Sequence, residues 1–142
     1  MIGFDKPRRV SRITILEPKS PGVHIFSRFG MPRIGAVLLG TIMRDLGYDV
    51  SVQVEEGKPF DWDRILASDL VGISCITATA TNGYSIADRV RTYGIPVVMG
   101  GPHPTHRSEE ALEHADFVVR GEGEVALPEL VQAIEKGEGF GS

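Results

Sequence analysis

Ile95-Pro96-Val97-Val98-Met99-Gly100-Gly101-Pro102-His103-Pro104-Thr105 sets a short apolar run directly before two glycines and two prolines. The arrangement returns where Asp116-Phe117-Val118-Val119 precedes Arg120-Gly121-Glu122-Gly123-Glu124. Glycine takes positive φ at no steric cost and lets the backbone come close to a ligand. Two such loops at the same ends of successive strands predict a ligand lying across one edge of a sheet.

Strand and helix patterns alternate five times along the chain. Apolar, β-branched runs predict strands, and apolar residues at helical spacing predict helices between them. The strands are expected at 12–17, 48–54, 69–74, 95–99 and 117–119. The helices are expected at 32–47, 61–66, 84–93 and 108–114, and a last helix, with Pro128 in its first turn, is expected to extend to 134. This alternation predicts an α/β fold: a doubly wound, five-stranded parallel sheet of order 2-1-3-4-5 with helices on both faces.

Ligands of such sheets bind beyond the carboxyl ends of the strands, at the point where the strand order reverses. The loops at 18–31, 75–83, 100–107 and 120–124 are all expected at that edge.

Two local features are also expected. Ser108 is predicted to cap its helix, and the helix at 32–47 is predicted to bury one apolar face: Ile34, Val37, Leu38, Thr41, Ile42 and Leu46.

The composition is that of a single globular domain. The chain has 142 residues and 42% hydrophobic content, and no apolar run approaches the ~20 residues that span a bilayer. No signal-peptide pattern follows the N-terminus, so a cytoplasmic location and no membrane partner are expected. The one cysteine, Cys75, excludes an internal disulfide and a local cysteine-cluster metal site.

Charge is unevenly distributed. Residues 1–44 carry a net charge of +6 and residues 45–142 a net charge of −10, for a total of −4. The overall negative charge does not favour nonspecific nucleic-acid binding. The basic region, including a predicted N-terminal arm at 1–11, is either a solvated surface or a contact surface for another domain or an anionic ligand.

Polar side chains in the predicted loops have two interpretations each. Hydroxyls at Ser74 and Thr77 either bind a polar ligand or cap a helix, and His103 is either a ligand contact or a turn residue. Glu122 either offsets a helix dipole or accepts hydrogen bonds from a ligand or a neighbouring domain, whereas Glu124 is expected to offset the helix dipole. The chain lacks the Walker and Gly-x-Gly-x-x-Gly phosphate motifs, and we assign no catalytic residue and no metal ligand.

Three stretches together resemble the N-terminal cobalamin (B12)-binding domain of B12-type radical SAM proteins. They are Asp69-Leu70-Val71-Gly72-Ile73-Ser74, the run Val97 to Thr105, and the run Asp116 to Glu124 with Leu127-Pro128-Glu129-Leu130 after it. The resemblance covers residues 12–137, with 138–142 expected as the start of a linker. It implies a flavodoxin-like sheet that holds the lower face of the corrin and its nucleotide tail at the carboxyl edge.

The resemblance also implies the cofactor-binding residues. These would be Ser74, Thr77, Ala78, Gly100, Gly101, His103, Thr105, Gly121, Glu122 and Gly123. Related mutase-type domains carry an Asp-x-His-x-x-Gly motif whose His ligates cobalt. Here the corresponding segment is Glu17-Pro18-Lys19-Ser20-Pro21-Gly22-Val23-His24, so His24 is not assigned as a cobalt ligand.

The radical SAM Cys-x-x-x-Cys-x-x-Cys motif is absent, and one cysteine cannot hold a [4Fe–4S] cluster. The chain alone is therefore not expected to be an enzyme. The resemblance implies a module that presents cobalamin to a downstream radical SAM barrel, which would hold the iron–sulfur cluster and S-adenosylmethionine and carry out methyl transfer or rearrangement. Two alternatives stay open: a degenerate interaction or regulatory domain that binds no corrin, and a flavodoxin-like binder of another ligand such as a flavin.

Overall fold

The sheet has the predicted strands in the predicted order. The computed structural model describes residues 4, 6–19, 34–55, 58–121 and 123–137. The strands are β1 (Arg12–Glu17), β2 (Asp49–Val54), β3 (Leu70–Ser74), β4 (Val97–Gly100) and β5 (Phe117–Val118). They pair in parallel in the order β2-β1-β3-β4-β5. The fold is therefore flavodoxin-like α/β, as expected.

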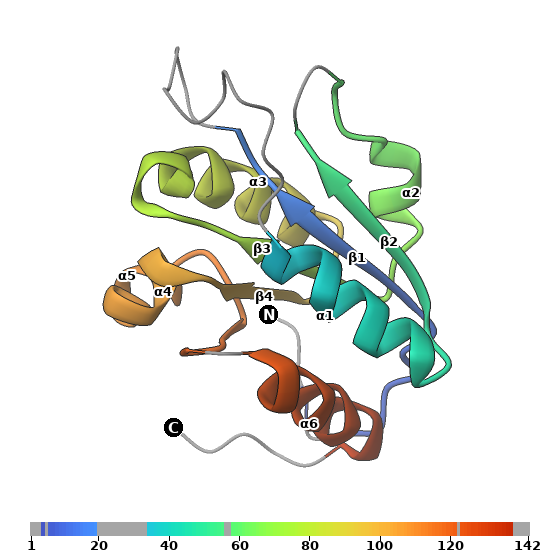
Figure 1. Cartoon of the computed structure of the whole chain (residues 1–142). Coiled ribbons are helices and arrows are strands. Elements are labelled where there is room, and N and C mark those ends of the chain that lie inside the picture. The colour runs from blue at the N-terminus through green and yellow to red at the C-terminus, as the bar shows by residue number, and fades with distance from the viewer. Residues whose placement is uncertain (1–3, 5, 20–33, 56–57, 122, 138–142) are drawn as a thin grey trace.

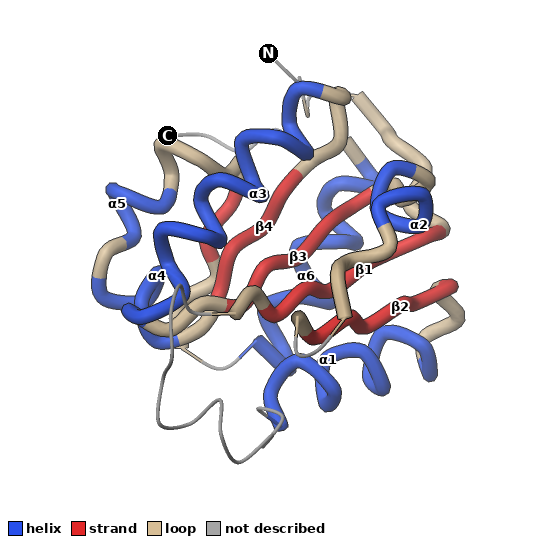
Figure 2. The backbone as a smooth tube through the Cα atoms, turned by 90° about the horizontal axis from the view of Figure 1, so that it is seen from above, coloured by secondary structure: helices blue, strands red, loops and turns tan. Residues whose placement is uncertain are grey.

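Helices cover both faces of this sheet (Figures 1 and 2). They are α1 (Ile34–Asp45), α2 (Trp62–Leu66), α3 (Ala80–Thr92), α4 (Pro102–His106), α5 (Ser108–Ala111) and α6 (Gly123–Lys136), with a 3₁₀ turn, η2, at Thr77–Thr79. Helices α1 and α6 pack together on one face, and α3 packs on the other against β3 and β4.

The two faces enclose separate hydrophobic cores, because successive side chains of a strand point to opposite faces. Ile13 and Ile15 of β1 belong to the core under α1 and α6. Leu16 of β1 and Val97 of β4 belong to the core under α2, α3 and α5. Each fully buried aliphatic side chain contributes about 1.5–3 kcal/mol to the free energy of folding, so the sheet is stabilised from both sides.

The register aligns the carboxyl ends of the central strands. Leu16 pairs with Ile73, and Ser74 pairs with Gly100. The segments that follow β1, β3, β4 and β5 therefore start at the same edge of the sheet, where the sequence predicts the ligand.

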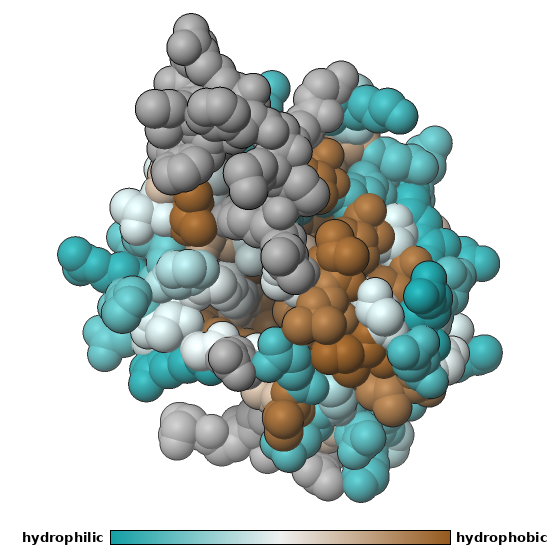
Figure 3. All heavy atoms as spheres, viewed as in Figure 1, coloured by the Kyte–Doolittle hydropathy of each residue, from teal (hydrophilic) through white to brown (hydrophobic). Residues whose placement is uncertain are grey.

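Helix α1 buries a different face from the one predicted. Val37, Leu38 and Leu46 are 48%, 40% and 55% exposed, whereas Ala36 and Met43 are buried. Figure 3 shows this apolar surface over α1. Apolar residues surround most of this helix, so their spacing does not identify the inner face. Close packing identifies it, because a Cβ on Gly40 would overlap Val52 Cγ2 of β2.

Three local predictions are wrong. Helix α3 begins at Ala80 rather than Tyr84, because the 3₁₀ turn η2 runs directly into it; within that turn, Thr79 Oγ1 accepts from the Ile76 N–H and donates to the Ile76 carbonyl. Ser108 is the first residue of α5 and not its cap; its Oγ accepts a hydrogen bond from Arg120 instead. Pro128 lies inside α6, five residues after its start, and not in the first turn.

The segment before β1 packs against β5 and α6. Phe4 contacts Phe117 of β5 edge to face, with ring centroids 4.7 Å apart. The Arg8 N–H donates to the Ile134 carbonyl of α6 at 3.3 Å, and Val10 is buried in the core under α1 and α6. Within the described ranges, no helix has the length and apolar character that a membrane crossing requires.

Candidate functional site

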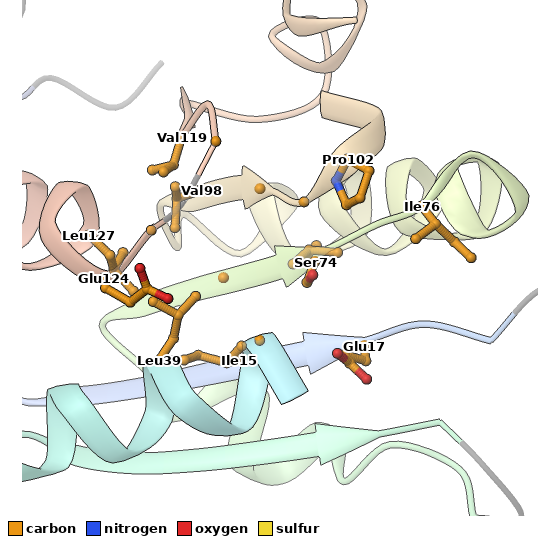
Figure 4. Close-up of a pocket in the computed structure, with 17 residues that line it drawn as sticks. Ile15, Glu17, Leu39, Ser74, Ile76, Val98, Pro102, Val119, Glu124 and Leu127 are labelled. Atoms are coloured by element: carbon orange, nitrogen blue, oxygen red, sulfur yellow. The ribbon is translucent and has the colours of Figure 1, made fainter. Parts of the chain in front are cut away.

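A cavity of about 320 Å³ opens at the carboxyl edge of the sheet. Its floor is formed by β1, β3 and β4, and its sides by α1, the start of α6 and the segments that follow β4 and β5. Figure 4 shows Ile15, Leu39, Val98 and Leu127 around this space. The lining is therefore mainly aliphatic, on the sheet face that α1 and α6 cover.

Gly72 leaves the space that the cavity occupies. It lies within β3, paired with Ile15 of β1 and Val98 of β4. A Cβ on Gly72 would lie 3.8 Å from Ile15 Cγ1 and 3.7 Å from Val98 Cγ1, which is ordinary contact. A side chain at this position would thus extend into the cavity without a clash at its first carbon.

Gly101 has a different role, at the rim. Its φ is +100°, and a Cβ would lie 2.6 Å from the Cys75 carbonyl oxygen and 3.2 Å from Ser74 Oγ. The Cys75 N–H donates to the Gly100 carbonyl at 3.0 Å, and the His103 N–H donates to the Cys75 carbonyl at 3.2 Å. The backbones after β3 and β4 therefore pack directly on each other, and glycine is required there.

The structure separates the predicted site residues into three groups. Ser74, Gly100, Gly101, Gly121 and Gly123 line the cavity. Four others do not line it: Thr77, Ala78, His103 and Thr105. The tenth, Glu122, lies outside the described residues, as does His24, which was not assigned to the site from the sequence. The segment 100–107, expected as a loop, is largely the short helix α4, with Pro102 in its first turn.

His103 points into a polar cluster that joins α3, α4 and α5. Its Nε2 lies 2.8 Å from Glu110 Oε2 and 3.0 Å from the Tyr84 hydroxyl oxygen, and its Nδ1 lies 3.3 Å from Thr77 Oγ1. Tyr84 donates to Glu110 at 2.6 Å and stacks on His114, with ring centroids 4.3 Å apart. These bonds hold His103 as an anchor of α4 rather than in the cavity wall.

The same cluster shifts the pKa of two of its side chains. Hydrogen bonds from Tyr84 and then His103 lower the pKa of Glu110 below its usual value. Burial, followed by the hydrogen bond to Glu110, raises the pKa of Tyr84. Both shifts favour an anionic Glu110 that accepts from a neutral tyrosine.

Two carboxylates also line the cavity. Glu17 is the last residue of β1 and is 2% exposed. Glu124 lies in the first turn of α6, where a negative charge is favourable beside the helix dipole, and it reaches toward Leu39 (Figure 4). Carboxylates accept hydrogen bonds from N–H and O–H groups, so the cavity combines aliphatic walls with acceptors at its edges.

Sequence reasoning missed Ile15, Glu17, Leu39, Gly72 and Leu127 as lining residues. One of them carried a usable signal, because a glycine inside a strand often marks a close approach of a ligand or another backbone. Gly72 interrupts the apolar run at 69–74 in this way. The aliphatic residues carry no such signal, since they resemble any core position.

The cavity has the size of a small ligand pocket. A volume of about 320 Å³ lies at the lower end of the range for such pockets. Gly72 and Gly100 would each accept a Cβ at ordinary contact distance, so small residues keep this space open.

Comparison with known proteins gives the family. The model of the B12 binding domain matches residues 25–131. An uncharacterized methyltransferase of Pyrococcus horikoshii is 40% identical over 117 residues, which cover 75% of this chain and 25% of that protein. The bacteriochlorophyllide d C-8(2)-methyltransferase of Chlorobaculum tepidum is 48% identical over 56 residues, covering 39% of this chain and 12% of that protein.

A longer match is more distant. The anaerobic magnesium-protoporphyrin IX monomethyl ester cyclase of Synechocystis is 27% identical over 138 residues, covering 87% of this chain and 28% of that protein. The chain thus spans less than a third of the length of each of these three relatives. The family match covers most of the chain and includes β2 to β5 with the glycine segments at the cavity, so the chain belongs to the B12-binding domain family.

Proposed function

We propose that this domain binds cobalamin and presents it to a radical SAM catalytic domain of the same parent protein. The observation that carries the proposal is the aliphatic cavity at the carboxyl edge of the sheet, kept open by Gly72 and Gly100. It lies beside β1 and β3, where the strand order reverses, and ligands of doubly wound sheets bind at such points.

The residues suggest how the cofactor would be held. Ile15, Leu39 and Val98 would contact the apolar base of the nucleotide tail, and burial of that base would supply most of the affinity. Glu17 and Glu124 are acceptors for N–H and O–H groups of the cofactor. The bare backbone at Gly100 and Gly101 would lie against the tail.

The chemistry would belong to the cofactor and to the rest of the parent protein. Cobalamin supplies an alkyl carrier at its cobalt, while a protein contributes binding, orientation and electrostatics. The names of two relatives include "methyltransferase", which supports methyl transfer as the parent reaction; the third is named a cyclase. An iron–sulfur cluster and S-adenosylmethionine would be bound outside the residues of this chain.

The test is a direct binding measurement. Purified protein is mixed with hydroxocobalamin, passed over a desalting column and scanned in the visible range, with a flavin mononucleotide mixture treated identically. We expect corrin absorbance to elute with the protein and flavin absorbance to stay with the small molecules. Retained flavin without corrin would support the flavodoxin-like alternative. Retention of neither, at protein concentrations of about 100 μM or more, would favour a domain that docks a partner without cofactor.

A further inference from the structure

Thr105 joins the two glycine segments that form the rim of the cavity. Gly101, after β4, and Gly121, after β5, both have positive φ, +100° and +71°, and both line the cavity. Thr105 lies on α4 between them and does not itself line the cavity. It therefore belongs to the support behind the rim.

One hydroxyl makes both contacts. Thr105 Oγ1 donates to the Gly101 carbonyl at 2.9 Å and accepts from the Gly121 N–H at 2.9 Å. A threonine hydroxyl has one donor and two acceptor sites, so its single proton is committed to Gly101 while it accepts from Gly121. The two bonds tie the segment after β4 to the segment after β5.

A bond within the helix explains only one of the two contacts, the one to Gly101. Threonine in a helix often donates to the carbonyl four residues earlier, and Gly101 stands four residues before Thr105. The bond from Gly121 crosses 16 positions of sequence and has no such local origin. Gly121 lies two residues after Val119, whose N–H donates to the Met99 carbonyl of β4.

The position of Gly121 matters for the cavity because α6 begins two residues later. Gly123 and Glu124 start that helix and line the cavity. A second contact, from Arg120 Nη2 to Ser108 Oγ at 2.6 Å, ties the same segment to α5. Thr105 is the contact closer to the rim, since both its partners line the cavity.

We infer that Thr105 is a positioning residue: it fixes the spacing of the Gly101 and Gly121 segments and thereby the width of the cavity mouth. The consequence for cofactor binding rests on the proposed function. Without the hydroxyl, Gly121 has no side-chain acceptor at this point, and the start of α6 moves more freely against β4. The cofactor must then order this segment when it binds, which weakens its affinity.

The test compares Thr105→Val with Thr105→Ser. Valine keeps the shape and removes the hydroxyl, while serine keeps the hydroxyl. The matched control is Thr41→Val on α1, because Thr41 Oγ1 makes the same local bond, to the Val37 carbonyl at 3.0 Å, and lies outside the cavity lining. Amide hydrogen exchange at Gly121 is measured by NMR in cofactor-free protein, and hydroxocobalamin affinity by absorbance titration.

We expect Thr105→Val to exchange at Gly121 about tenfold faster than the wild type and to bind hydroxocobalamin about fivefold more weakly, the effect of one hydrogen bond. Thr105→Ser and Thr41→Val should match the wild type in both measurements. Unchanged exchange at Gly121 in Thr105→Val would overturn the inference. Faster exchange with unchanged affinity would overturn it too, leaving a purely structural bond. If the wild type binds no hydroxocobalamin, the proposed function fails, and exchange at Gly121 alone decides whether Thr105 fixes the rim.

Discussion

Single glycines decide the shape of the candidate site, and they do so for opposite reasons. At Gly72 the missing side chain leaves room for a ligand, since a Cβ meets its neighbours at ordinary distances. At Gly101 the missing side chain lets two backbones touch, with positive φ. Substitutions at these positions should therefore have different effects, although both glycines line one cavity.

Gly101→Ala is expected to destabilise the fold. The new Cβ would overlap the Cys75 carbonyl oxygen, at 2.6 Å, in a backbone conformation that alanine disfavours. We expect the free energy of unfolding, measured by urea denaturation, to fall by about 1–3 kcal/mol. Gly35→Ala is the control, because a Cβ there meets nothing within 4 Å. A Gly101→Ala variant as stable as the wild type would contradict the close contact at the rim.

Glu110 should contribute stability that depends on pH. Hydrogen bonds from Tyr84 and then His103 lower its pKa below the usual value for a glutamate. A carboxyl whose pKa is lower in the folded state stabilises the fold above the unfolded pKa, and this contribution is lost as pH falls through the folded pKa. Urea denaturation between about pH 3 and pH 7 should therefore show a steeper loss of stability toward acid in the wild type than in Glu110→Gln.

The adjacent Glu109→Gln variant provides the control for that experiment. It removes a neighbouring exposed carboxylate of α5 without touching the bonds between Glu110, Tyr84 and His103. Its stability should follow the wild-type pH dependence. If Glu110→Gln also follows the wild type at every pH, the cluster does not couple α5 to α3 and α4 as the geometry indicates.

Among the elements, α1 is the one whose inward face the sequence pattern does not identify. Met43 is fully buried, whereas Val37 is 48% exposed. Met43→Ala should lower the free energy of unfolding by about 2–5 kcal/mol, while Val37→Gln should change it by no more than about 0.5 kcal/mol. Urea denaturation of the two variants side by side checks the orientation of the helix, and a reversed order would show that the face carrying Val37 is the buried one.

Across the whole molecule, the sequence predicts the topology better than the site. Alternating strand and helix patterns give the strand order, because the handedness of crossovers leaves few arrangements. Glycine at the strand ends predicts Gly100, Gly101 and Gly121 as lining residues. Leu39 and Leu127 stay hidden, because a leucine that lines a cavity has the same spacing as one that fills a core.

His103 shows a further limit of reading a motif from sequence. Its place between Pro102 and Pro104 leaves open whether it contacts a ligand or serves as a turn residue. Its partners, however, are Tyr84 on α3 and Glu110 on α5, and nothing in the local sequence links these three positions. The role of such a side chain depends on tertiary contacts, so it becomes visible only once the helices are packed.

The central claim is that the cavity beside Gly72 seats part of cobalamin, and Gly72→Val tests it most directly. Valine suits a strand, so stability should stay within about 1 kcal/mol of the wild type, while its methyl groups occupy the cavity. Val97→Ala is the control: Val97 belongs to the core on the opposite face of the sheet, and the variant should lose about 1–3 kcal/mol yet bind normally.

The measurement is hydroxocobalamin affinity, by absorbance titration, for the wild type and both variants under conditions where all are folded. We predict binding to the wild type and to Val97→Ala with similar affinity, and binding to Gly72→Val that is weaker by about tenfold or more. Equal affinity of folded Gly72→Val and the wild type would contradict the account, because cobalamin would then bind without using this cavity.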